Sequence, residues 1–239
     1  MEKYCALKIE NISVAYDSNL ILDEVSFVVP QGVFAAIIGP NGAGKTTLLK
    51  VIVNIVTPRK GSVHIFSQQF SAVNKKIAYI AQRALIDWDF PVSVFDVVLM
   101  GRYGYLGWAK RPQAYDYNCA MKALEQVDLV SFRNVHINEL SGGQQQRMFI
   151  ARALAQNAEL YILDEPFAAV DKISESIIVN VFKELAHNGK TVVIVHHDLS
   201  LLENYFDWLI VIDKQCKASG EIHSVLNTSA ADKYTLRKN

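Results

Sequence analysis

The chain has 239 residues, of which 51% are hydrophobic and 20% charged, a composition that favours a globular protein with a sizeable core. Its formal net charge is +0, which argues against a broad basic surface for DNA or RNA. Because its three cysteines form no C-x-x-C pair, we expect plain apolar side chains in a reducing compartment. No apolar run approaches roughly 18 residues and no signal-peptide layout is visible, so we expect a soluble cytoplasmic protein built as one compact unit.

The N-terminal part of the chain predicts β-strands. Residues 4–16 and 25–29 alternate or run apolar with β-branched side chains, and a turn is expected at 17–19. Residues 33–38 form a short apolar run suited to a buried parallel strand. Tyr16 is a candidate to stack on an adenine ring, although taken alone it is better explained as a packed strand residue.

A glycine-rich loop follows the strand at 33–38 and leads into an apolar helix over 45–53. The loop matches G-x-x-x-x-G-K-S/T, the phosphate-binding pattern, over Gly39, Pro40, Asn41, Gly42, Ala43, Gly44, Lys45, Thr46 and Thr47. Its glycines allow backbone N–H groups to point at anionic oxygens, and the helix adds its positive N-terminal end. Lys45 can reach the outer phosphates, and the Thr46 hydroxyl can hold a magnesium ion. Because strand, loop and helix occur in this order, a nucleotide site is a better interpretation than an ordinary turn.

Two further strands are predicted at 63–66 and 75–81, and the second ends at Gln82. Open α/β sheets bind ligands at the carboxyl ends of their strands, so Gln82 is placed to touch one. Taken alone, Gln82 also fits a solvated loop residue.

From residue 83 to 136 the β signal fades, and helices are predicted at 94–100 and 112–127. This region also holds several aromatic residues in a stretch punctuated by glycines. Such aromatics can form a docking surface for a partner or the core of a small helical subdomain, and composition does not choose between the two. The residues concerned are Trp88, Phe90, Tyr103, Tyr105 and Trp108.

A second anion-binding site is suggested by Leu140-Ser141-Gly142-Gly143-Gln144, which precedes an apolar helix. Ser141 is a preferred N-cap residue, and a serine with two glycines at a helix N-terminus can bind an anion. The simpler interpretation is a well-capped helix and nothing more.

A buried strand at 160–163 ends in Asp164 and Glu165. Carboxylates without a partner are costly beside a core, so they indicate a cation or a proton-transfer role. Asp164 is suited to magnesium, and Glu165 to orienting and deprotonating a water molecule. The alternative, a merely solvated strand end, fits poorly with the phosphate loop upstream.

A helix over 170–187 and strands at 191–195 and 208–212 complete the predicted elements; the tail after Asp213 gives little signal. His196 and His197 follow the strand at 191–195. Because adjacent strand residues face opposite ways, we do not expect both to reach one ligand, which disfavours a His-His-Asp zinc site.

The chain resembles the ATP-binding-cassette ATPases over about residues 7–222. The resemblance is carried by Leu140-Ser141-Gly142-Gly143-Gln144, which lies between the phosphate loop and the strand that ends in Asp164-Glu165. The resemblance implies one ATP-binding domain over 1–239 of α/β class. Its core would be the P-loop NTPase (RecA-like) parallel sheet, with an N-terminal antiparallel β subdomain and an inserted α-helical signature subdomain at about 83–157.

The resemblance also implies roles for single residues. Tyr16 would stack on adenine, Gln82 would sense magnesium and the γ-phosphate, and His197 rather than His196 would contact the γ-phosphate. Asp171 would communicate across a dimer, where the usual Ser-Ala-Leu-Asp reads Ala168-Ala169-Val170-Asp171. The usual Thr-His-Asp reads His196-His197-Asp198, a second departure.

In this family two chains pack head to tail as a homodimer or pseudo-dimer, and each signature helix caps the γ-phosphate of the other chain's ATP. The resemblance thus implies that Ser141, Gly142, Gly143 and Gln144 complete the partner's site. Hydrolysis at Glu165 would then release the dimer.

Two classes of cassette protein compete. DNA-repair members carry a long coiled coil between phosphate loop and signature, but too few positions separate Lys45 from Ser141 and no heptad run intervenes. Ribosome-associated members usually carry two cassettes per chain, and this chain has one. A transport ATPase without a nucleic-acid partner is therefore the better interpretation.

Residues 82–94, 98–103 and 195–199 are similar to the manganese, zinc and iron importers of bacteria, with a siderophore or cobalamin importer as the alternative. The similarity implies ATP and Mg²⁺ as cofactors, separate integral membrane permease subunits and an extracytoplasmic solute-binding protein. It places the chain on the cytoplasmic face of the inner membrane. The aromatic stretch near Gln82 would dock on the permease, with Trp88, Phe90 and Tyr103 as the expected contacts.

Overall fold

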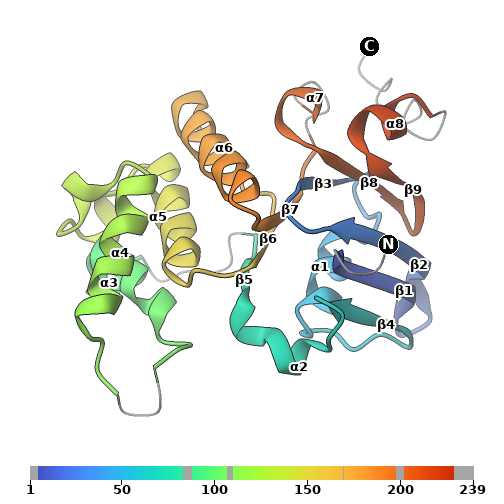
Figure 1. Ribbon diagram of the computed structural model, residues 1–239, viewed down its shortest axis with the longest axis horizontal. Coiled ribbons are helices and arrows are strands. Elements are labelled where there is room, and N and C mark those ends of the chain that lie inside the picture. Colours follow the sequence, from blue (N-terminus) through green and yellow to red (C-terminus); the bar gives the residue numbers. More distant parts are fainter. Residues whose placement is uncertain (1–4, 83–87, 107–109, 169, 198–201, 229–239) are drawn as a thin grey trace.

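The computed structural model describes residues 5–82, 88–106, 110–168, 170–197 and 202–228 (Figure 1). Within these residues the main sheet has the strand order β5-β6-β7-β3-β8-β9. In that order the strands are β5 (Ile77–Ile80), β6 (Leu160–Asp164), β7 (Thr191–Val195), β3 (Phe34–Ile38), β8 (Trp208–Asp213) and β9 (Gln215–Glu221). All neighbours pair in parallel except β8 and β9, which are antiparallel.

Strand β3 separates two hydrophobic cores, and all five of its residues are buried. Successive strand side chains point to opposite faces of a sheet. Phe34, Ala36 and Ile38 accordingly belong to one core, whereas Ala35 and Ile37 belong to the other. Because both faces are covered, the strand reads as a continuous apolar run, as predicted.

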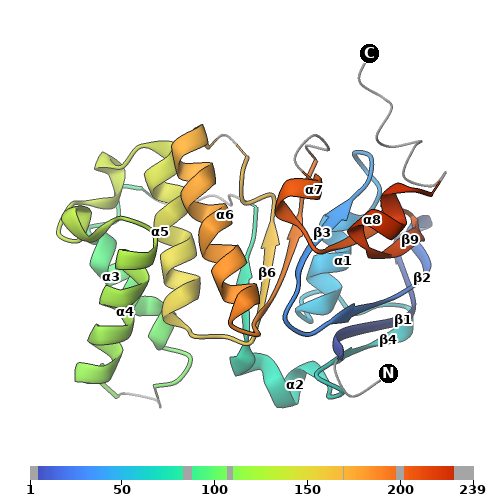
Figure 2. The same cartoon turned by 45° about the horizontal axis from the view of Figure 1, so that its top comes forward.

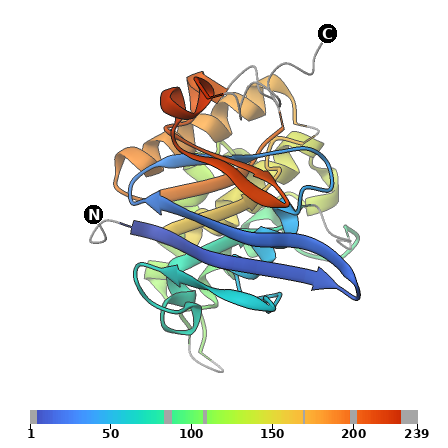
Figure 3. The ribbon, with the colours of Figure 1, turned by 90° about the vertical axis from the view of Figure 1, so that its right-hand side faces the viewer.

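The second sheet is antiparallel, in the order β2 (Asn19–Pro30), β1 (Cys5–Tyr16) and β4 (Lys60–Ile65). It forms one side of the molecule, as Figure 3 shows. Helix α1 (Lys45–Ile52) shares a core with both sheets through Leu48 and Leu49. Helix α2 (Phe70–Val73) and the short 3₁₀ helix Asn74–Lys76 connect β4 to β5.

The elements described between β5 and β6 are helical. They include α3 (Val94–Leu99), α4 (Ala114–Gln126) and α5 (Gly142–Ala155), together with 3₁₀ turns at Met100–Arg102, Val130–Phe132 and Ile137–Glu139. Figures 1 and 2 show α3, α4 and α5 at the end of the molecule away from the antiparallel sheet. Helix α6 (Lys172–His187) lies between these helices and the main sheet, and its Phe182 packs on Phe34. Short helices α7 (Leu202–Tyr205) and α8 (Ile222–Leu226) flank the last strands.

The observed elements follow most of the predicted ones. Strand β2 begins at Asn19 rather than at 25, and helices α2 and α7 were not predicted. Three further segments also differ. Lys75 and Lys76, predicted in a strand, lie in the 3₁₀ helix before β5. The strand predicted at 63–66 ends at Ile65, because Phe66 and Ser67 both have positive φ (50° and 60°) and turn the chain. The tail also contains β9 and α8, which the weak pattern there did not predict.

No helix in the described ranges has the length and apolar character needed to cross a membrane.

Candidate functional site

The glycine-rich loop between β3 and α1 surrounds a cavity of about 320 Å³. Gly39, Gly42 and Gly44 have positive φ values of 154°, 79° and 94°, which only glycine adopts without strain. A Cβ at Gly44 would also meet the Leu22 side chain at 2.5 Å. The loop therefore needs its glycines for backbone conformation and for close packing. The cavity is lined by Ile21, Asn41, Gly42, Ala43, Gly44, Lys45, Thr46, Thr47 and Glu165.

The ammonium group of Lys45 lies back on the loop. Its Nζ donates to the carbonyl oxygens of Gly39 at 2.8 Å and Pro40 at 3.0 Å. Burial lowers the pKa of Lys45, and the carboxylates of Glu165 and Asp164 act in the opposite direction. A cation is thus placed at the loop where phosphate oxygens would bring negative charge.

Asp164, the last residue of β6, is a buried carboxylate with both oxygens available. Its exposure is 2%, and neither Oδ1 nor Oδ2 has a hydrogen-bond partner among the described residues. Burial raises the pKa of Asp164, while the Thr46 hydroxyl and Lys45 lower it. Buried carboxylate oxygens are costly unless they coordinate a metal or pair with a cation. Together with the Thr46 hydroxyl, they match the oxygen ligands that Mg²⁺ prefers, so the residues present fit this ion.

Glu165 and Gln82 meet at the carboxyl ends of neighbouring strands. Nε2 of Gln82 donates to Oε2 of Glu165 at 3.2 Å. Strands β5 and β6 pair in parallel, with Ile80 opposite Leu163, so the residues that follow them lie at the same edge of the sheet. Glu165 has a φ of 51°, an uncommon conformation for a non-glycine residue and one associated with functional sites.

The two histidines after β7 differ in exposure, although their ring centroids lie only 5.9 Å apart. His196 is only 4% exposed, and its ring contacts Phe167 and Phe206 at centroid distances of 5.5 and 5.6 Å. His197 is exposed. No cluster of three or more metal-ligating side chains is present in the described part of the chain, and Asp198 lies outside it.

The second glycine motif begins helix α5 with reciprocal hydrogen bonds. The Ser141 Oγ accepts from the Gln144 N–H at 3.3 Å, and the Gln144 Oε1 accepts from the Ser141 N–H at 2.8 Å. This capping box explains why the helix begins here. A Cβ at Gly143 would overlap the carboxylate of Asp171 and the hydroxyl of Ser174, so only glycine allows α5 to approach α6 this closely.

Asp171 is fixed by its own helix. Its Oδ1 accepts from the Ser174 N–H at 2.9 Å and caps α6. Hydrogen bonds from the backbone and hydroxyl of Ser174 lower the pKa of Asp171. The structure thus brings Asp171 next to Gly143, a contact between two predicted site residues that the sequence pattern does not indicate.

Two sets of predicted residues lie apart from the phosphate loop. The residues described as lining its cavity include none from 141–144, and α5 lies on the far side of β6 from α1 in Figures 1 and 2. Tyr16, at the end of β1, is 49% exposed and is also absent from that lining. Ile21 of β2 also lines the cavity, and the sequence does not predict this because nothing in an apolar strand residue signals a ligand.

Comparison with known proteins identifies the family. The family model described as "ABC transporter" matches residues 22–168. The zinc transport system ATP-binding protein TroB of Treponema pallidum is 46% identical over 92% of this chain and 82% of the relative. The manganese transport system ATP-binding protein MntB of Bacillus subtilis is 45% identical over 92% of this chain and 88% of the relative.

Solved structures agree with these relatives. The ADP conformation of an ATP-binding cassette of an ABC transporter superposes with a TM-score of 0.83 at 28% identity, over 97% of both chains. A dimeric bacterial ABC transporter cassette gives a TM-score of 0.76 at 28% identity, over 90% of this chain and 98% of the other. The predicted P-loop NTPase fold is thereby confirmed. The chain belongs to the ABC transporter family and is an ATPase of that family.

Proposed function

We propose that this ATPase energises the uptake of a divalent metal cation, manganese, zinc or iron, through a separate membrane permease. The observation that supports the ATPase activity is that Lys45 and Glu165 line the phosphate-loop cavity, with the carboxylate of Asp164 near enough to Lys45 to oppose the lowering of its pKa by burial. The zinc and manganese transport relatives, at 46% and 45% identity over most of the chain, support the metal.

ATP binding would use the loop residues 39–47. Their N–H groups and Lys45 would hold the phosphates, and Tyr16 would stack on the adenine ring. Asp164 and Thr46 would hold Mg²⁺, with Gln82 as a further ligand, and this ion supplies charge neutralisation at the phosphates. Glu165 would accept a proton from the attacking water, and His197 would contact the γ-phosphate.

A lone chain would hold only half of each ATP site. The separation of residues 141–144 from the phosphate-loop cavity supports a head-to-tail pair in which Ser141, Gly142, Gly143 and Gln144 contact the partner's ATP. The dimeric cassette with the same fold supports this arrangement. We propose a homodimer or a pseudo-dimer, with Asp171 at the junction and the whole chain as one domain carrying a helical subdomain at about 83–157.

The remaining partners would be integral membrane permease subunits, with an extracytoplasmic solute-binding protein that selects the ion. The chain would lie on the cytoplasmic face of the inner membrane. Nucleic acid is not a partner in this proposal, in agreement with the formal net charge of +0.

Uptake of radioactive manganese, zinc and iron in a deletion strain tests the proposal. We expect loss of uptake of one of these metals, restored by the wild-type chain but not by Lys45→Ala or Glu165→Gln. If the deletion strain takes up all three metals normally but fails to take up a siderophore or cobalamin, the transported substrate is that molecule and not a free metal cation. Stimulation of the ATPase by DNA or ribosomes, and none by a permease, would overturn the transport role.

A further inference from the structure

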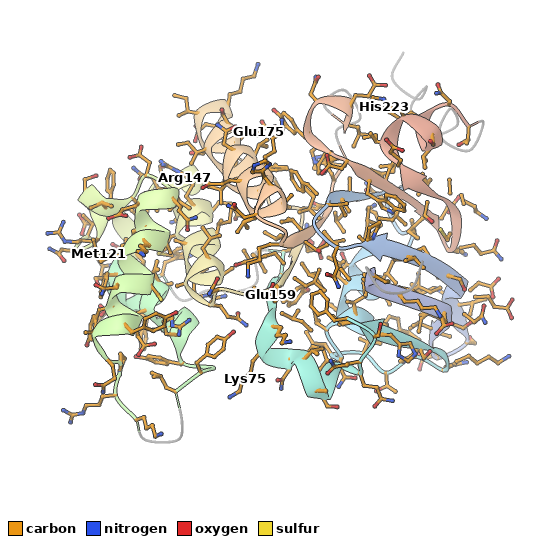
Figure 4. All side chains as sticks on the ribbon, viewed as in Figure 1. Lys75, Met121, Arg147, Glu159, Glu175 and His223 are labelled. Atoms are coloured by element: carbon orange, nitrogen blue, oxygen red, sulfur yellow. The ribbon has the colours of Figure 1, made fainter. Side chains whose placement is uncertain are left out.

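Three consecutive backbone carbonyls, at the end of the 3₁₀ helix Asn74–Lys76 and the first residue of β5, accept hydrogen bonds. Tyr105 and Gln156 donate from the α3–α5 side, and Glu159 donates from the residue before β6. The Tyr105 hydroxyl donates to the Lys75 oxygen at 2.6 Å. The Gln156 amide donates to the same oxygen at 3.3 Å and to the Ile77 oxygen at 2.7 Å. The Glu159 N–H donates to the Lys76 oxygen at 2.8 Å. Figure 4 shows Lys75 and Glu159 where these helices adjoin the main sheet.

Arg102 connects Tyr105 to the helices. Its buried guanidinium pairs with Asp116 of α4 at 3.0 Å and donates to the Ala155 carbonyl, at the end of α5, at 3.0 Å. It also lies 4.8 Å from the centre of the Tyr105 ring, in cation–π geometry. The ring of Tyr105 is therefore fixed relative to both α4 and α5, and its hydroxyl reaches outward to Lys75.

The hydrogen bonds to the carbonyls of Lys75, Lys76 and Ile77, which we call the junction, lie at one end of β5. Gln82 follows the other end of the strand. A four-residue strand spans only about 13 Å, and it is a rigid element between the two. A shift of the helices at Lys75 would move β5 and with it the hydrogen bond between Gln82 and Glu165. Gln156, the C-cap of α5, reinforces the same junction because it contacts two of the three carbonyls.

We propose that Tyr105 is a positioning residue that, together with Gln156, sets the orientation of α3–α5 on β5 and so the approach of Gln82 to Glu165. The orientation part is independent of any activity; the part concerning Gln82 and Glu165 rests on the proposed function. The hydroxyl is the group that matters, because the ring is held by Arg102.

Tyr105→Phe and the double variant Tyr105→Phe/Gln156→Met test the orientation. Tyr117→Phe is the matched control: its ring is also exposed and stacks on Phe95, and it is not one of the donors to the three carbonyls. Spin labels at Lys60→Cys on β4 and Lys122→Cys on α4, both exposed, report the distance between the two sides. All proteins carry Cys5, Cys119 and Cys216 replaced by alanine so that only these two positions are labelled.

We expect a broader inter-label distance distribution for Tyr105→Phe and a still broader one for the double variant. Tyr117→Phe should keep the wild-type distribution. An unchanged distribution in the double variant would overturn the proposal, whatever its melting temperature. ATP turnover of the same variants without labels tests the second part. We expect kcat to fall several-fold with KM for ATP unchanged, since the phosphate loop is untouched. A broadened distribution with wild-type kcat would remove the link to Gln82, while inactivity of the wild-type protein would refute the proposed function and leave the orientation result standing.

Discussion

Gln82 donates a 3.2 Å hydrogen bond to the carboxylate of Glu165, although the two residues are far apart in the sequence. The contact arises because β5 and β6 are parallel neighbours in the main sheet. Glu165 also lines the phosphate-loop cavity, as the proposed role of this carboxylate toward an attacking water requires. In the proposed mechanism, a movement of Gln82 would therefore change how readily Glu165 accepts a proton.

Glu165→Gln should remove the base and keep the shape. We expect ATP binding to persist, because the phosphate loop is unchanged, and hydrolysis to fall by about 10²–10⁴-fold, the usual contribution of a general base. The variant should accumulate as an ATP-bound dimer, visible by light scattering after size-exclusion chromatography. Glu184→Gln, an exposed carboxylate on α6, is the control. Normal turnover in Glu165→Gln would refute the assignment of the base.

Asp164→Asn should separate stability from function. A raised pKa means that the folded chain binds the Asp164 proton more strongly than the unfolded chain, so at neutral pH the ionised carboxylate costs stability. Removing the charge should raise Tm by a few degrees without nucleotide, the effect of about 1 kcal/mol in a domain of this size. The same change should abolish the extra stabilisation by Mg-ATP, because a ligand oxygen is lost.

The stability that Asp164→Asn gains over the wild-type chain should depend on pH with a defined sign. Below the ordinary Asp pKa of 3.8 the carboxyl group is protonated in both states, so the wild-type chain and Asp164→Asn should become equally stable. As pH rises through the raised folded pKa, the variant should become the more stable of the two. Thermal melts from pH 3.5 to 7.5 in the absence of magnesium measure this, and a gain that is largest in acid would contradict it.

Local patterns predicted most elements, because their signals lie within a few residues. The apolar run at 191–195 is strand β7, and Asp171 caps the helix expected to open there. The contacts between elements were beyond such patterns. The pairing of Gln82 with Glu165 depends on strand order, and the fit of Gly143 against Asp171 depends on how α5 crosses α6. The ion pair of Arg102 with Asp116 is likewise visible only when α4 has folded back.

Gly143→Ala should disturb the signature helix without disturbing the phosphate loop. The new methyl group would overlap the carboxylate of Asp171 and the Ser174 hydroxyl, so α5 and the start of α6 must separate. We expect nucleotide binding by the single chain to be retained and ATP-driven dimerisation in the Glu165→Gln background to weaken at least tenfold. Gly104→Ala, where a methyl group meets nothing within 4 Å, is the control. Equal dimerisation of Gly143→Ala and Gly104→Ala would show that the close contact of Gly143 with Asp171 is not needed for dimerisation.

The proposed permease contacts divide into two kinds. Phe90 and Tyr103 are 54% and 53% exposed, as a docking residue would be before its partner binds. Trp88 is half-buried, packs against the core of the helices, and its ring lies 6.0 Å from that of Phe149. Replacement of Trp88 should therefore lower both the stability of the chain and its affinity for the permease. Replacement of Phe90 or Tyr103 should lower only the affinity for the permease.

Phe90→Ala/Tyr103→Ala should separate docking from ATP chemistry. Aromatic anchors at the centre of an interface contribute about 2 kcal/mol or more each, so we expect co-purification with the permease subunits and metal uptake to be lost. Melting temperature and ATP hydrolysis by the purified chain should stay near wild type, because both side chains project into solvent. Ile55→Ala removes an apolar side chain that is 62% exposed and lies just after α1, which makes it a control for nonspecific loss of surface. Wild-type assembly and uptake in the double variant, and in the triple variant with Trp88→Ala, would place the permease contact elsewhere on the chain.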